Sequence, residues 1–158
     1  MKINAKLLQK IANQKKLGKK IVLVTGVFDV LHQEHVEFLT KAKGVGDFLM
    51  VGLESDVRVK KMKGEDRPIN NEVTRVKNLA SLSIADWVFL LPEKFDNPLD
   101  REKLIIQLQP DILAVSSHTN HLDKKRAIME KFGGQLLVVL KHNPQVSSTI
   151  IINDHRGK

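Results

Sequence analysis

The sequence predicts an α/β fold, in which a single Rossmann-like domain contains a doubly wound, five-stranded parallel sheet with helices on both faces. Short β-prone runs alternate with helical segments along the whole chain. Runs such as residues 21–24 are apolar throughout, which is typical of strands buried on both faces of a parallel sheet. A length of 158 residues suits one domain with one core. Strands that alternate with helices in this way indicate a parallel sheet covered on both sides.

Each element follows from its own pattern. Residues 4–16 carry Leu7, Leu8 and Ile11 at helical spacing, and Gly18 ends this leading helix. A strand over 20–25 ends at Gly26, and a helix over 33–43 follows. The remaining predicted elements are a strand over 48–53, a short helix over 56–62 capped by Asp56, a helix capped by Asn70, a strand over 87–91, a helix over 100–108, a strand over 112–115, a helix over 122–132, a strand over 136–140 and a short capped helix from Ser147. Residues 1–19 thus form a leading helix, and residues 20–153 form the core of one domain over 1–158.

The composition excludes several classes of site. The chain has no cysteine, so disulfides, thiolate metal sites and cysteine catalysis are excluded. No apolar run has the length of a membrane span, and the start of the chain does not resemble a secretory signal. We therefore expect a cytoplasmic protein without a membrane partner.

The charge of the chain points to an anionic ligand. The net charge is +8, and basic residues gather in two groups, over 15–20 and over 58–67. A basic surface is also consistent with nucleic-acid binding or with solubility alone. Aromatic residues are few, with six Phe, one Trp and no Tyr, so a stacking platform for single-stranded nucleic acid is poorly supported. We expect no nucleic-acid partner.

The turn after the first predicted strand carries the clearest chemical signal. It reads GVFDVLHQEH over residues 26–35 and leads into a helix. In a doubly wound sheet, ligands bind beyond the carboxyl ends of the strands, and a helix N-terminus favours an anion. His32 and His35 are three residues apart and share one helix face, so both can donate hydrogen bonds to phosphate oxygens.

Two other interpretations of the histidine pair stay open. The pair caps or packs the helix, or it binds a metal ion with a third ligand from His118 or His121. We expect phosphate binding, with no metal site of the protein's own and with Mg²⁺ carried by a nucleotide.

Residues 26–35 resemble the GxFDxxHxGH signature of the cytidylyltransferase-like nucleotidyltransferases. Within this family the sequence is most similar to the adenylyltransferase domain that acts on heptose 1-phosphate in lipopolysaccharide precursor synthesis, and glycerol-3-phosphate cytidylyltransferases are close relatives. The resemblance runs from about residue 21 to residue 152. Further matching segments are Gly46-Asp47, Ser55-Asp56, Lys63-Gly64, Arg67-Pro68, Arg75, Asp86-Trp87-Val88, residues 110–113 and Ser147-Ser148-Thr149.

The resemblance implies a reaction and a set of residues. A nucleoside monophosphate would move from ATP or CTP to a small phosphorylated acceptor such as a sugar phosphate, and pyrophosphate would leave. Catalysis would fall to His32, His35 and Lys63. The residues implied in nucleotide binding are Val27, Phe28, Lys61, Arg67, Arg75, Ser147, Ser148 and Thr149. We expect the acceptor at Asp29, Ser117 and His118. A homodimer is also implied, since relatives often form dimers.

The sequence departs from the family pattern at two places. Glu34 stands where the signature has glycine, and it adds bulk and a negative charge near a triphosphate. Three interpretations of Glu34 stay open. Its side chain points away from the nucleotide, or it pairs with a cation or Mg²⁺ in a variant site, or the site has lost activity. We favour a functional variant. The heptose enzymes also carry a Lys-Gly-Gly-Asp type segment after the fourth strand, where this chain has residues 115–121 without lysine or glycine. The acceptor therefore need not be a heptose phosphate, and glycerol-phosphate cytidylylation, flavin adenylylation or non-catalytic nucleotide binding stay open.

Overall fold

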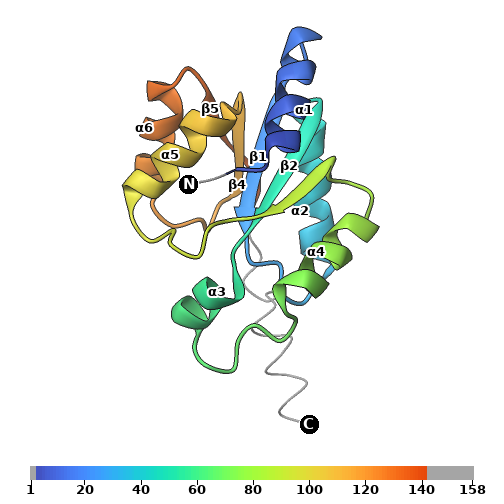
Figure 1. The fold of residues 1–158 in the computed structure, drawn as a ribbon, viewed down its shortest axis with the longest axis vertical. Helices are drawn as coiled ribbons and strands as arrows, with labels where there is room; N and C mark the ends of the chain where they lie inside the picture. Colours follow the sequence, from blue (N-terminus) through green and yellow to red (C-terminus); the bar gives the residue numbers. More distant parts are fainter. Residues whose placement is uncertain (1–2, 142–158) are drawn as a thin grey trace.

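Five parallel strands form the centre of the structure, a computed structural model that describes residues 3–141 (Figure 1). In chain order the elements are α1 (Ala5–Lys16), β1 (Ile21–Gly26), α2 (Gln33–Gly44), β2 (Phe48–Leu53), α3 (Asp56–Lys63), α4 (Glu72–Ser81), β3 (Trp87–Leu90), α5 (Pro98–Leu108), β4 (Ile112–Ser116), α6 (Leu122–Lys131) and β5 (Gln135–Leu140). The predicted fold class is confirmed. The capped helix predicted from Ser147 lies outside the described residues.

The order of the strands places a switch point beside β1. The sheet runs β3-β2-β1-β4-β5, so the chain first builds outward on one side of β1 and then on the other. β1 pairs with β2 along its whole length, from Ile21 opposite Phe48 to Gly26 opposite Leu53. In doubly wound sheets, ligands bind at such a reversal, beyond the carboxyl ends of the strands.

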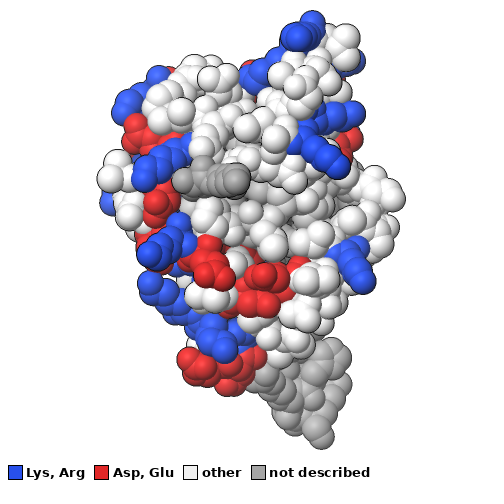
Figure 2. Space-filling view, in the orientation of Figure 1, with Lys and Arg blue, Asp and Glu red and all other residues white. Residues whose placement is uncertain are grey.

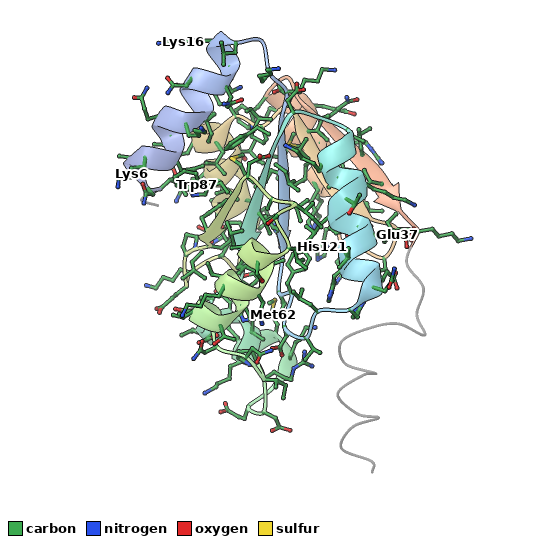
Figure 3. All side chains as sticks on the ribbon, turned by 90° about the vertical axis from the view of Figure 1, so that its right-hand side faces the viewer. Lys6, Lys16, Glu37, Met62, Trp87 and His121 are labelled. Carbon is green, nitrogen blue, oxygen red and sulfur yellow. The ribbon has the colours of Figure 1, made fainter. Side chains whose placement is uncertain are left out.

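Two apolar cores lie on the two faces of the sheet. Ile21 and Leu23 of β1 pack with residues of α1, α5 and α6, whereas Val22 and Val24 pack with α2 and α4. Successive strand residues point to opposite faces, so one apolar run fills both cores. Figure 3 shows α1 and α2 on opposite sides of the sheet, with α1 marked by Lys6 and Lys16 and α2 by Glu37.

Several predicted helix starts differ from the observed ones by one or two residues. Ser55, not Asp56, caps α3, and Asn71, not Asn70, caps α4. The side-chain amide of Asn70 instead donates to the backbone oxygen of Asp29, and the backbone amide of Asn70 donates to the Asp29 carboxylate. The helix predicted from residue 100 begins at Pro98, because Asn97 and Asp100 form a capping box around it.

Most charged side chains of the described chain lie on the surface in mixed groups, and the buried exceptions are Asp29, Glu54, Arg58, Arg67 and Arg75. Figure 2 shows Lys and Arg interspersed with Asp and Glu on the viewed face, around an uncharged area. Within residues 3–141, every helix is too short or too polar to cross a bilayer.

Candidate active site

The loop that leaves β1 turns sharply at Phe28. Phe28 adopts a left-handed backbone conformation with φ of 49°, and its ring folds back over Gly26. A Cβ atom at Gly26 would lie 2.8 Å from that ring, so glycine is required at this position. The buried Phe28 ring then contacts His35, with ring centroids 5.2 Å apart. The turn thereby directs the chain into α2 above the switch point.

His32 and His35 form a stacked pair at the start of α2. His32 is the N-cap residue, with an extended backbone, and His35 lies in the first turn. Their ring centroids are 3.8 Å apart and the ring planes are inclined by 19°. The Nδ1 atom of His35 is buried and has no hydrogen-bond partner among residues 3–141. The two predicted histidines therefore lie together at the N-terminus of α2, where the free backbone amide groups favour an anion.

The environment of His35 keeps its ring neutral. Burial, followed by repulsion from His32 and from Lys63, lowers the pKa of His35 from 6.5 to about 3. A neutral imidazole has one N–H donor and one acceptor nitrogen. At neutral pH, His35 therefore offers a hydrogen bond rather than a charge to a bound phosphate.

Glu34 lines the same pocket as the two histidines. Glu34 is therefore part of the cavity wall, and the direction of its carboxylate relative to a bound nucleotide stays a prediction. The side chain lies in the first turn of α2, where a negative charge is favourable for the helix itself. A nucleotide bound to this helix start would lie beside the carboxylate.

Lys63 reaches the pocket from the end of α3, whereas Lys61 does not. Lys63 precedes Gly64, whose φ of 104° ends the helix. Partial burial of its amine, and then Arg67, lower the pKa of Lys63, while Asp29 acts in the opposite direction. Lys61 forms an ion pair with Asp96 at 3.1 Å and is not among the lining residues.

Asp29 and Arg67 form a buried ion pair beneath the loop. Asp29 has no exposed surface, and its carboxylate accepts hydrogen bonds from Arg67 Nε at 3.1 Å and from the amides of Ile69 and Asn70 at 2.8 Å. Neither Asp29 nor Arg67 lines the pocket. The structure therefore gives Asp29 a part in holding the loop rather than in contacting an acceptor.

Arg75 connects four segments around the site. Its guanidinium donates to the backbone oxygens of Val27, Glu54 and Asn70 at 2.8–3.0 Å. It also pairs with the Asp56 carboxylate at 2.7 Å. Arg75 is fully buried and is not among the lining residues, so it supports the site instead of facing a nucleotide as expected.

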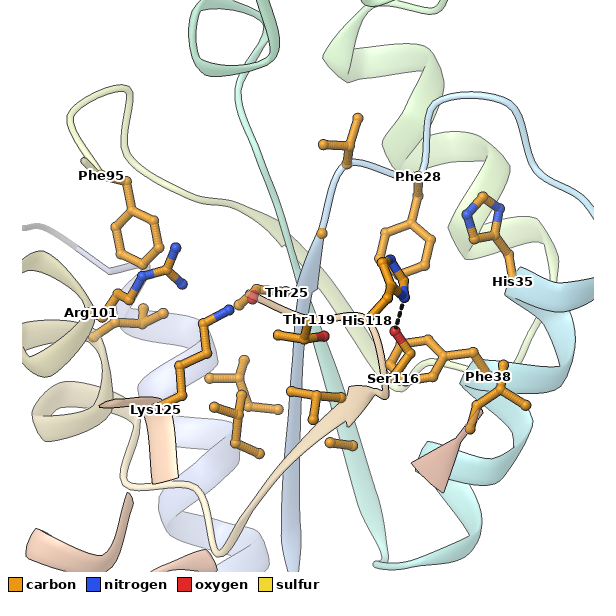
Figure 4. Close-up of a pocket in the computed structure, with 18 of the residues that line it drawn as sticks. Thr25, Phe28, His35, Phe38, Phe95, Arg101, Ser116, His118, Thr119 and Lys125 are labelled. Atoms are coloured by element: carbon orange, nitrogen blue, oxygen red, sulfur yellow. Dashed lines mark hydrogen bonds between the residues drawn. The ribbon is translucent and has the colours of Figure 1, made fainter. Parts of the chain in front are cut away.

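A cavity of about 310 Å³ opens beyond the carboxyl ends of β1 and β4 (Figure 4). One wall consists of Phe28, His35 and other residues of α2 and the preceding loop. On the floor, Ser116 Oγ and His118 Nδ1 form a hydrogen bond of 2.7 Å. Ser117, one of the residues expected at the acceptor, does not line the cavity. Ser147, Ser148 and Thr149 lie outside the described residues.

The opposite wall holds residues that sequence reasoning missed. Arg101 of α5 and Lys125 of α6 line the cavity together with Thr25 and Thr119 (Figure 4). Both cations lie in helices whose sequences have an ordinary amphipathic pattern, and a basic residue in such a helix usually faces solvent. The local signal that could have indicated Arg101 is its place just after the connection between β3 and α5, because connecting loops often carry binding residues.

The geometry does not favour a metal ion at the histidine pair. Within the described part of the chain, no three His, Asp or Glu side chains gather closely enough to hold a metal ion. His121, one of the two candidate third ligands, is exposed at the start of α6.

A parallel sheet with a cavity at its switch point, and with stacked histidines at a helix start, defines a Rossmann-like α/β domain. Comparison with protein families gives the particular group: the cytidylyltransferase-like family model matches residues 23–154. The chain belongs to the cytidylyltransferase-like family, as the motif predicted.

Curated relatives agree with this assignment. The bifunctional protein HldE of Citrifermentans bemidjiense is 39% identical over 142 residues, which is 89% of this chain and 28% of that protein. The HldE protein of Blochmanniella pennsylvanica is 37% identical over 154 residues, or 96% of this chain and 31% of that protein. The chain thus spans about a third or less of the length of these relatives.

Solved structures show the same fold. A lipopolysaccharide core biosynthesis protein from Thermoplasma volcanium superposes with a TM-score of 0.66 at 27% identity, covering 80% of this chain and 98% of that protein. Pantothenate synthetase from Thermus thermophilus superposes with a TM-score of 0.58 at 15% identity, covering 89% of this chain and 65% of that protein. At this lower identity the likeness concerns the fold alone.

Proposed function

We propose that this domain is a nucleotidyltransferase that moves a nucleoside monophosphate from ATP or CTP to a small phosphorylated acceptor, such as a sugar phosphate, and releases pyrophosphate. The observation that carries the proposal is the stacked His32–His35 pair at the start of α2, with Lys63 on the same cavity. Family membership and the likeness to a lipopolysaccharide core biosynthesis protein support it.

The proposed reaction is an in-line displacement at the α-phosphorus. An oxygen of the acceptor phosphate attacks that phosphorus, the bond to the bridging oxygen of the β-phosphate breaks, and the electron pair leaves with pyrophosphate. His32 and His35 donate hydrogen bonds to the phosphate oxygens, on which charge develops in the transition state. Lys63 adds a positive charge from the end of α3. Such a step requires placement and charge stabilisation, and no covalent nucleophile.

Two groups of residues expected to bind the nucleotide belong to this proposal. Ser147, Ser148 and Thr149 stay predicted to bind phosphates at the start of a last helix. Val27 and Phe28 line the cavity and are proposed to contact the nucleotide through their backbone groups.

We propose that Mg²⁺ accompanies the nucleotide. Mg²⁺ prefers oxygen ligands and retains several waters, so the phosphates and one carboxylate suffice to hold it. Glu34 supplies such a carboxylate on the cavity wall. The ion would neutralise phosphate charge, and the acidic side chain at the position of the family's glycine would then favour the metal–nucleotide complex.

The experiment that tests the proposal measures pyrophosphate release. Purified protein with Mg²⁺ is combined with ATP or CTP and with a panel of sugar, polyol and flavin phosphates. We expect release that depends on one nucleotide and one class of acceptor. The absence of release across the panel, together with tight nucleotide binding by calorimetry, would instead support a non-catalytic nucleotide-binding protein, which is the second candidate because Glu34 lies in the cavity.

A further inference from the structure

Two cationic side chains face the cavity from the wall opposite the histidines. Arg101 extends from the first turns of α5, and Lys125 extends from α6 (Figure 4). The Arg101 guanidinium lies 5.4 Å from the centre of the Phe95 ring. Within residues 3–141, neither cation has a hydrogen bond or an ion pair to an acidic side chain.

The surroundings of these two cations disfavour their charge. Burial and repulsion from Arg101 lower the pKa of Lys125 to about 8, and burial also lowers the pKa of Arg101. Glu54 is the acid whose charge acts on both, but it is held by Arg58 at 3.4 Å. Among residues 3–141, no acidic side chain lies within ion-pair distance of either cation, so two cations that line one cavity form a site that an anionic ligand would complete.

The chemistry of in-line transfer suggests which anion this is. The attacking oxygen approaches the α-phosphorus from the side opposite the leaving pyrophosphate. The helix start with His32 and His35 lies on one wall, so an acceptor phosphate has to enter from the other. Arg101 and Lys125 occupy that other wall, near Thr25 and Thr119, whose hydroxyls can bond to an acceptor.

We propose that Arg101 and Lys125 bind the phosphate of the acceptor and thereby select a phosphorylated substrate. This inference rests on the proposed function. It assigns the acceptor side of the cavity to α5 and α6. Of the residues expected at the acceptor, which are Asp29, Ser117 and His118, only His118 lines the cavity.

The test uses inorganic phosphate as a probe of the acceptor subsite in the full chain. Calorimetry measures phosphate binding with the nucleotide subsite saturated by Mg²⁺ and α,β-methylene-ATP, an analogue whose reactive bond cannot break. The variants are Arg101→Met and Lys125→Met. The matched controls are Lys103→Met and Lys124→Met, which remove exposed lysines from the same two helices. Circular dichroism verifies that each variant is folded.

We expect each of the two variants to weaken phosphate binding at least tenfold, while their affinity for the nucleotide analogue and the behaviour of both controls stay unchanged. Equal phosphate binding by wild type and variants would overturn the proposal, as would phosphate binding that disappears when the analogue is present. Failure of the proposed function is a separate result. It would appear as intact phosphate binding without pyrophosphate release for any acceptor.

Discussion

The stacked histidines are the residues on which the proposed reaction depends most. Replacing His32 or His35 with alanine removes one hydrogen-bond donor from the transition state. We expect kcat to fall by about 10²–10³ in each variant, the loss typical of one such donor. Steady-state pyrophosphate release measures the effect, and His121→Ala, at the exposed start of α6, is the control. Unchanged turnover in both variants would rule out the mechanism.

The neutral state of His35 makes the stability of the protein depend on pH. Its pKa is about 3 in the folded chain and 6.5 in the unfolded chain, so the unfolded state takes up the proton first as the pH falls. The stabilising contribution is therefore complete above pH 6.5 and is lost progressively toward pH 3.

Comparison with His35→Gln isolates this effect. Urea unfolding at about pH 7.5 and about pH 4.5 should show that wild type loses roughly 2–3 kcal/mol more than the variant across that range. Parallel losses in the two proteins would mean that His35 is not held neutral by the fold.

Glu34 should affect nucleotide binding in a manner that depends on Mg²⁺. Two unit charges about 5 Å apart repel by roughly 3 kcal/mol at an effective dielectric constant near 20. Without Mg²⁺, Glu34→Gly should therefore bind ATP up to about a hundredfold more tightly than wild type. With saturating Mg²⁺ the gain should disappear, because the ion neutralises the repulsion.

Isothermal titration with and without Mg²⁺ measures both affinities. Glu37→Gly provides the control for glycine in the same helix, since Glu37 is exposed and pairs with Lys41 at 3.1 Å. The same ratio of affinities under both conditions would mean that Glu34 does not interact with the metal.

Among the structural elements, α4 holds the site together through one residue. Arg75 bonds to loop and strand ends from β1, β2 and the segment before α4, and to the first residue of α3. Arg75→Met would leave Asp56 and three carbonyl oxygens without this partner. We expect a loss of about 2–4 kcal/mol in the free energy of unfolding, because backbone acceptors around the buried Arg75 lose their hydrogen bonds, while the partly exposed Asp56 can be solvated.

Denaturant unfolding with the midpoint and slope fitted separately gives this value. Lys77→Met on the exposed side of the same helix should change stability by less than about 0.5 kcal/mol. If Arg75→Met behaved like the Lys77 variant, the hydrogen bonds of Arg75 would not be supporting the site.

For the molecule as a whole, ligand binding should raise the melting temperature. A ligand at a hundred times its Kd adds about 2.7 kcal/mol when only the folded state binds it. For a chain of this size that corresponds to an increase of roughly 5–10 °C. Thermal unfolding with Mg²⁺ and ATP should show this shift, whereas adenosine at the same concentration should not. An equal shift with adenosine would mean that the phosphates contribute nothing.

Much of the fold could be predicted because its signals are local. Runs such as residues 21–24 and 48–53 are apolar throughout, which is typical of strands covered on both faces of a parallel sheet. The strand order depends on which strands pair across the chain, and no local pattern encodes it.

The histidine pair was predictable from its spacing within one turn of helix. Arg101 and Lys125 were not, because they meet only when α5 and α6 pack on the same face of the sheet.

The joint between β1 and β4 has a further consequence. β1 is in register with β2 over six residue pairs but with β4 over only two, Val22 with Ile112 and Leu23 with Leu113. The sheet is thus two ribbons, β3-β2-β1 and β4-β5, joined along a short seam, and the cavity lies directly beyond it. A molecule that contacts both walls would connect the two ribbons at the place where they share the fewest backbone pairs. With the site occupied, the two ribbons would therefore resist sliding past each other better than with the site empty.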